Sequence, residues 1–169
     1  IVERGYRRAL LPWLRHLRFA SGAGIIPSTH QTKSGIAEGS SVLRKNKAKA
    51  KLLAGETVYG SIVSFNSPAV VEMGGAVGFD FTMIDCEHGP MNEETVEGLV
   101  RAAEVFALTP LARVPDNSPD VILRFLDRGL QGVIVPHVNS RAEAELAARS
   151  CRYHPQGDRG MAGGGRNAN

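Results

Sequence analysis

From residue 57 onward, short apolar runs alternate with longer segments that begin at a helix-capping residue and often end at a glycine. The short runs are rich in β-branched and aromatic residues, which is typical of strands. Serine or asparagine before the longer segments, twice followed by proline, is typical of helix starts. The pattern predicts strands at 57–65, 79–85, 109–114 and 132–136 and helices at about 67–77, 92–106, 118–128 and 140–151, after a short helix at 44–54.

The strand–helix pair recurs four times, in units of roughly 25 residues, and strict alternation of this kind predicts parallel strands with right-handed crossovers. A doubly wound sheet and half of a (β/α)8 barrel share this pattern. The first strand is not followed by a glycine-rich dinucleotide-binding turn, and polar residues gather where a barrel would use them. The sequence therefore favours an α/β fold that is a partial (β/α)8 TIM barrel, comprising about its first four β-α units.

The N-terminal segment differs from this pattern and suggests a boundary between 1–45 and 46–169. Residues 4–19 are basic, with apolar residues at loosely helical spacing that Pro12 interrupts. They suit either a basic amphipathic targeting segment or a poorly ordered tail, and we favour the tail. The chain starts with isoleucine and stops after a glycine-rich run, so we expect a gene fragment or a natural truncation.

Charge is distributed unevenly along the chain. Residues 1–51 contain 11 Lys and Arg against 2 Asp and Glu, whereas residues 52–169 contain 9 against 15. The basic balance therefore belongs to the N-terminal segment, and we expect no nucleic-acid partner. No apolar run is long enough to span a bilayer and no signal-peptide pattern is present, so we expect a cytoplasmic protein with no membrane partner. Cys86 and Cys151 are expected to be reduced thiols.

Ionisable residues follow the predicted strands where each strand ends. Asp85 ends the second strand and precedes Glu87 and His88, Arg113 ends the third, and His137 follows the fourth. In a (β/α)8 barrel the chemistry lies at the C-terminal ends of the strands. We therefore expect these side chains to meet at one edge of the sheet.

His88 is the candidate acid or base, because an imidazole can hold or release a proton near neutrality. The alternative is a surface histidine bonded to a backbone group. Asp85 and Glu87 suit two roles: they could orient the His88 ring, which we favour, or bind a hard cation.

Arg113 lies in an apolar strand, where a guanidinium must be paired or face a polar site. Its fork suits a substrate carboxylate or a developing oxyanion; the alternative is a structural salt bridge. His137 suits either a pocket wall or a plain loop position. The stretch 157–165 could bind an anion through backbone N–H groups, although a flexible loop is the simpler interpretation.

Several stretches together resemble the HpcH/HpaI aldolase family, the metal-dependent 2-oxo-acid aldolases. They are AGETVYGSIVSFNSPAVVE, AVGFDFTMIDCEHGP, PLARVPDN, LDRGLQGVIVPHVNS and RYHPQGDRGMAGGGR, and the resemblance covers about 47–169. It implies that a divalent cation (Mg²⁺, Mn²⁺ or Co²⁺) acts as a Lewis acid on pyruvate. The implied substrates are 4-hydroxy-2-oxo acids, which the family cleaves to pyruvate and an aldehyde.

The resemblance also implies roles for individual residues. His88 matches the family's catalytic base, and Arg113 matches the arginine that steadies developing negative charge. Asp127 matches an aspartate that raises the basicity of the histidine, although a barrel places the end of this helix near the opposite edge. The metal ligands of the family, a Glu and an Asp on later strands, would lie beyond Asn169, so none is expected in this chain.

The family further implies a homo-oligomer, commonly a hexamer. Because a half barrel leaves an open sheet edge and an unfilled interior, we expect no aldolase turnover from the 169-residue chain alone. Two alternatives stay open: an acyl-CoA lyase related to the citrate-lyase β type, and a non-catalytic fragment that serves in assembly.

Overall fold

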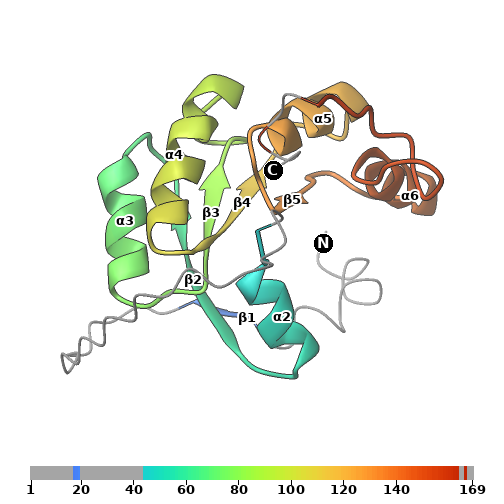
Figure 1. Ribbon diagram of the computed structural model, residues 1–169. Coiled ribbons are helices and arrows are strands. Elements are labelled where there is room, and N and C mark those ends of the chain that lie inside the picture. Colours follow the sequence, from blue (N-terminus) through green and yellow to red (C-terminus); the bar gives the residue numbers. More distant parts are fainter. Residues whose placement is uncertain (1–16, 20–43, 164–165, 167–169) are drawn as a thin grey trace.

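The computed structural model describes residues 17–19, 44–163 and 166, which form a parallel β-sheet covered by helices (Figure 1). The sheet order follows the chain, β1-β2-β3-β4-β5. The strands are β1 (Leu17–Phe19), β2 (Val58–Val63), β3 (Phe81–Asp85), β4 (Thr109–Arg113) and β5 (Gly132–Ile134). The helices are α2 (Lys47–Leu53), α3 (Pro68–Ala76), α4 (Glu93–Val105), α5 (Pro119–Asp127) and α6 (Arg141–Ser150).

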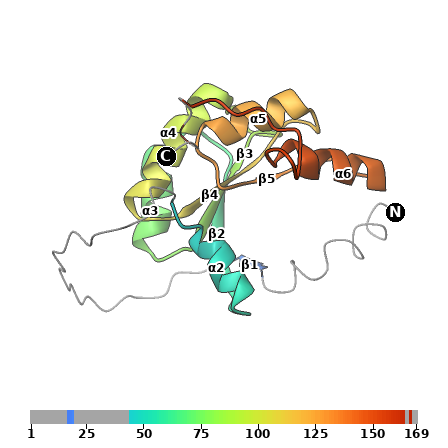
Figure 2. The ribbon, with the colours of Figure 1, turned by 45° about the vertical axis from the view of Figure 1, so that its right-hand side comes forward.

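The strand order decides between the two folds that the sequence allowed. A doubly wound sheet reverses its order at a switch point, whereas this sheet adds each strand beside the previous one, with parallel pairing throughout. Helices α3, α4 and α5 pack on the same face of the sheet (Figures 1 and 2). This is the arrangement of consecutive units of a (β/α)8 barrel.

The main hydrophobic core lies between this helical layer and the sheet. Alternate strand residues such as Val63, Ile84 and Ala112 are fully or almost fully buried there, against Val96 and Phe125 of the helices. Successive strand residues point to opposite faces, so the neighbours of these residues face the other side of the sheet, where a barrel has its interior.

Helix α2 lies on that other face. Its Ala48 packs against Val58, Phe81 and Met83, and the Ala48 amide donates to the Thr109 hydroxyl at 3.1 Å. The sequence predicted the helix but not its placement, because a short helix carries no signal of the face that it will cover.

The helix starts were predictable because of their caps. Asn92 and Ser140 each form a capping box, with Thr95 and Glu143 as the reciprocal partners. Ser67 precedes α3 as predicted, but its side chain makes no capping hydrogen bond.

Strand β1 corrects the expectation of a poorly ordered tail at residues 17–19. Leu17 pairs with Val58 and Phe19 with Gly60, parallel to β2. Three residues are too few to show the alternation of apolar and polar positions that marks a strand. Nothing in the sequence therefore distinguished this strand from the loosely helical spacing around it. The remainder of the predicted basic segment, including Pro12, lies outside the described residues.

At residues 157–159 the structure differs from the expectation of a flexible or anion-binding loop after α6. The amide of Asp158 donates to the Arg149 carbonyl at 3.0 Å and that of Arg159 to the Arg152 carbonyl at 2.9 Å. The Arg159 guanidinium bonds to Asp127 at 2.6 Å. These contacts fix the first part of the stretch against α5 and α6, with its amides occupied by backbone carbonyls.

Both cysteines are free thiols, as expected. Burial raises the pKa of the Cys86 thiol to about 12. Among the described residues, none of the helices has the length and apolar character that crossing a bilayer requires.

Candidate active site

Asp85 and Arg113 form a two-pronged ion pair at the C-terminal edge of the sheet. They are register partners on adjacent strands, so their side chains leave the same face of the sheet side by side. Arg113 donates from Nε to Oδ1 of Asp85 at 3.0 Å and from Nη2 to Oδ2 at 2.7 Å. The hydrogen bonds from Arg113 hold the pKa of the Asp85 carboxyl below its usual range, and they raise the pKa of Arg113 in turn.

Asp85 also shapes the loop that follows β3. Its Oδ1 accepts the backbone amides of Glu87 and His88, each at 3.2 Å. A side chain at Gly89 would place its Cβ 2.2 Å from the Asp85 carbonyl oxygen, so only glycine fits there. Asp85 therefore positions His88 through its backbone amide, rather than through the ring as the sequence suggested.

Glu87 links the ends of three strands. Its Oε1 lies 3.0 Å from Nε2 of His137, and its Oε2 lies 3.2 Å from Nε of Arg113 and 3.8 Å from Nε2 of His88. The Glu87 side chain is 12% exposed, against 69% for His88 and 80% for His137. We call these five residues, Asp85, Glu87, His88, Arg113 and His137, the edge cluster. Its two carboxylates are far more buried than its two imidazoles.

Asp127 lies away from the edge cluster. It is the last residue of α5, a nine-residue helix that runs back from the C-terminal edge by about 13 Å at 1.5 Å per residue. In the described part of the chain Asp127 pairs with Arg159, whose side chain is 6% exposed. The structure thus brings His88, Arg113, Asp85 and His137 together but leaves Asp127 at the opposite edge, and its effect on His88 remains a prediction.

The model of one protein family, described as HpcH/HpaI aldolase/citrate lyase, matches residues 59–168. The edge cluster lies entirely within that range. The chain belongs to this family.

The relatives agree with that assignment. The 5-keto-4-deoxy-D-glucarate aldolase of Escherichia coli K12 is 39% identical over 116 residues, which are 69% of this chain and 45% of that protein. A HpcH/HpaI aldolase structure from Desulfitobacterium hafniense has a TM-score of 0.65 at 31% identity, covering 68% of this chain and 45% of that one. The structure of citrate synthase SbnG has a TM-score of 0.66 at 39% identity, covering 69% and 48%. The chain thus spans about half the length of the relatives it matches.

The donor set of this HpcH/HpaI chain does not fit a complete divalent-metal site within the described residues. No group of three or more His, Cys, Asp or Glu side chains there has an arrangement that could hold a metal. Asp85 and Glu87 are the carboxylates of the edge cluster, and both are engaged by Arg113. The described residues therefore do not supply a complete set of ligands for a divalent cation.

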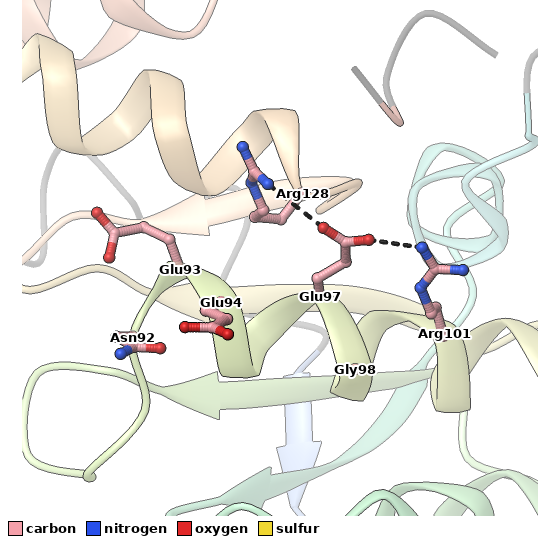
Figure 3. A pocket seen from close by; sticks show the side chains of 7 residues that line it. All are labelled: Asn92, Glu93, Glu94, Glu97, Gly98, Arg101 and Arg128. Carbon is pink, nitrogen blue, oxygen red and sulfur yellow. Dashed lines mark hydrogen bonds and ion pairs between the residues drawn. The ribbon is translucent and has the colours of Figure 1, made fainter. Parts of the chain in front are cut away.

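A hollow of about 570 Å³ between α4 and α5 is not part of the edge cluster (Figure 3). Its most connected carboxylate, Glu97, bonds to Arg101 at 2.6 Å and to Arg128 at 3.3 Å. Glu93 and Glu97 join α4 to α5 through ion pairs with Arg124 and Arg128. These ion pairs make the hollow part of the contact between the two helices.

Sequence reasoning missed two partners in this region. From the sequence, Glu87 was expected to orient the ring of its neighbour His88. Its shortest side-chain contact is instead with His137, about fifty positions away, and no local sequence pattern signals this contact. Arg159 was placed in a loop, although it pairs with Asp127. An arginine in a glycine-rich stretch gives no sign of being almost fully buried.

The Asp85–Arg113 pair predicts a specific pH dependence of stability. Because the folded-state pKa of Asp85 is lowered, its contribution is fully present above the unfolded value of about 3.9 and is lost as the pH falls through the folded-state pKa. The difference in free energy of unfolding between the wild type and Asp85→Asn should therefore shrink steadily below about pH 4. Denaturant unfolding of both proteins from neutral to acidic pH checks this; a difference that stays constant with pH would contradict it.

Proposed function

We propose that the full gene product is an aldolase that cleaves 4-hydroxy-2-oxo acids to pyruvate, or a close relative of pyruvate, and an aldehyde. The observation that carries the proposal is an accessible His88 beside an Arg113 fork that a buried carboxylate holds in place. The family membership and the aldolase named among the relatives support it.

In this proposal His88 removes the proton from the C4 hydroxyl of the substrate. The C3–C4 bond then breaks, the aldehyde leaves, and the electron pair remains on the three-carbon fragment as the enolate of pyruvate. A proton returned to C3 completes the reaction. A base of this kind contributes typically 10²- to 10⁴-fold to the rate.

Arg113 stabilises the negative charge of the enolate. Asp85 occupies the Nε and Nη2 side of its fork, which leaves the Nη1 group to donate to a substrate oxygen. Because the pair is fixed before the substrate binds, the donor needs no rearrangement during the reaction. His137, on the neighbouring loop, lies beside the same space and is proposed to contact the substrate.

A divalent cation (Mg²⁺, Mn²⁺ or Co²⁺) is part of the proposal on the basis of the family resemblance. Its carboxylate ligands would have to come from outside the described residues. We likewise propose a homo-oligomer, a hexamer by analogy with the family, and a small 2-oxo acid as the substrate.

One alternative is supported by a specific observation. The family description includes citrate lyase, and a solved relative is named citrate synthase. A lyase of the citrate-lyase β type, acting on an acyl-CoA thioester, would use the same edge of the sheet. It should cleave a thioester substrate and leave 4-hydroxy-2-oxo acids intact.

The deciding experiment measures pyruvate release from 4-hydroxy-2-oxo acids by the full gene product, coupled to lactate dehydrogenase and NADH oxidation. Turnover that is lost with a chelator and restored by Mg²⁺, Mn²⁺ or Co²⁺ is expected. Thioester cleavage without pyruvate release would favour the alternative. The 169-residue chain, assayed in parallel with added metal, is expected to show no turnover.

A further inference from the structure

Glu87 is the member of the edge cluster to which the proposed mechanism gives no part, although it has more side-chain partners there than His88. Each of its two carboxylate oxygens has a partner within the edge cluster. Oε1 faces Nε2 of His137 at 3.0 Å, and Oε2 faces Nε of Arg113 at 3.2 Å. His88 is farther away, at 3.8 Å.

We propose that Glu87 is a positioning residue that holds His137 and Arg113 in the orientation in which they bind the substrate, a proposal that rests on the function proposed above. In this role Nε2 of His137 carries the ring proton and faces Oε1 of Glu87 at 3.0 Å, because a carboxylate can only accept a hydrogen bond. Glu87 thereby selects one of the two tautomers of the His137 ring.

The backbone at His137 indicates that this placement is specific. His137 has a φ of +56°, a left-handed conformation that is uncommon for a residue other than glycine. Its carbonyl oxygen accepts the side-chain amide of Asn139 at 2.9 Å. The His137 side chain is 80% exposed, so packing restrains the ring little. In the proposed role, the contact with Glu87 restrains the ring instead.

The same carboxylate braces Arg113. Asp85 already binds the guanidinium from one side, and Oε2 of Glu87 adds a second anionic contact at Nε. The charged groups around Glu87 are thus Arg113 from β4, His137 from the loop after β5, and His88 and Asp85 from its own strand and loop.

This arrangement separates the effect of Glu87 from that of His88. The backbone of His88 is held by Asp85 and not by Glu87, so the proton-transfer step should survive the loss of Glu87. Substrate binding should be weakened, because His137 would lose the contact that restrains its ring, whereas Arg113 keeps both hydrogen bonds to Asp85. Glu87→Gln is therefore expected to raise KM by about tenfold and to change kcat by less than about threefold.

The matched control is Glu97→Gln, which removes the charge of another carboxylate that joins two cationic side chains, on the outer surface between α4 and α5. It should change neither KM nor kcat. The double variant Glu87→Gln/His137→Ala should raise KM little beyond the His137→Ala single variant, because the shared interaction is lost only once. Additive effects, or a loss of kcat with unchanged KM, would overturn the proposal.

A second readout does not depend on the reaction. ¹⁵N imidazole NMR of the full gene product reports which ring nitrogen carries the proton. The His137 ring is expected to show a protonated Nε2 in the wild type and in Glu97→Gln, and a mixture of tautomers in Glu87→Gln. Identical His137 signals in all three proteins would overturn the positioning role, whereas failure to release pyruvate would remove the proposed function and leave this result standing.

Discussion

Replacing His88 with alanine is expected to lower kcat by about 10²- to 10⁴-fold, the usual contribution of a general base. The His88 side chain is 69% exposed, and its one ion-pair partner in the described region, Glu87, lies 3.8 Å away. Its removal should therefore change the free energy of unfolding by less than about 0.5 kcal/mol, as for other surface substitutions. Steady-state kinetics of pyruvate release and thermal unfolding of the same preparations measure the two effects separately.

The matched control is His154→Ala, which removes another exposed histidine, outside the edge cluster. It should leave both kcat and the unfolding temperature unchanged. If His88→Ala instead lost stability while keeping normal turnover per folded molecule, His88 would be a structural residue, and the base would have to be sought elsewhere in the cluster.

The order of the elements could be predicted from the sequence because local signals specify it. Asn92 and Ser140 start helices through capping boxes that span only three residues. The convergence of Asp85 and Arg113 was predictable for a similar reason: in parallel sheets the C-terminal ends of adjacent strands meet at one edge. The pairing of the two side chains could not be predicted. Whether Arg113 forms a structural ion pair or faces a substrate depends on the register between β3 and β4.

The structure shows the ion pair: Asp85 binds Nε and Nη2 of the Arg113 fork. A contact between Arg113 and the substrate stays a prediction. Long-range contacts account for what the sequence missed. The pairing of β1 with β2, the partnership of Glu87 with His137, and that of Asp127 with Arg159 each join residues about thirty or more positions apart. None of these pairs has a spacing that a helix or strand period could reveal.

Replacing Arg113 with methionine is expected to cost both stability and activity. Asp85 is 4% exposed, so the variant leaves a buried carboxylate with two backbone amides and no cation. Removing one partner of a buried pair destabilises by about 3 kcal/mol or more, because the remaining charge is uncompensated. The loss of the charge-stabilising donor should lower kcat by about 10²-fold in addition.

Two further variants separate these effects. Asp85→Asn/Arg113→Met removes both charges, so it should recover part of the stability lost in Arg113→Met and none of the activity. Arg113→Lys keeps the positive charge but not the planar fork, so it should be more stable than Arg113→Met and still impaired in turnover. Denaturant unfolding and kinetics on all four proteins measure this. If the double variant were no more stable than Arg113→Met, the cost would come from lost packing of the arginine side chain. If Arg113→Lys retained full turnover, a positive charge alone would suffice, and the geometry that Asp85 imposes on the guanidinium would have no catalytic consequence.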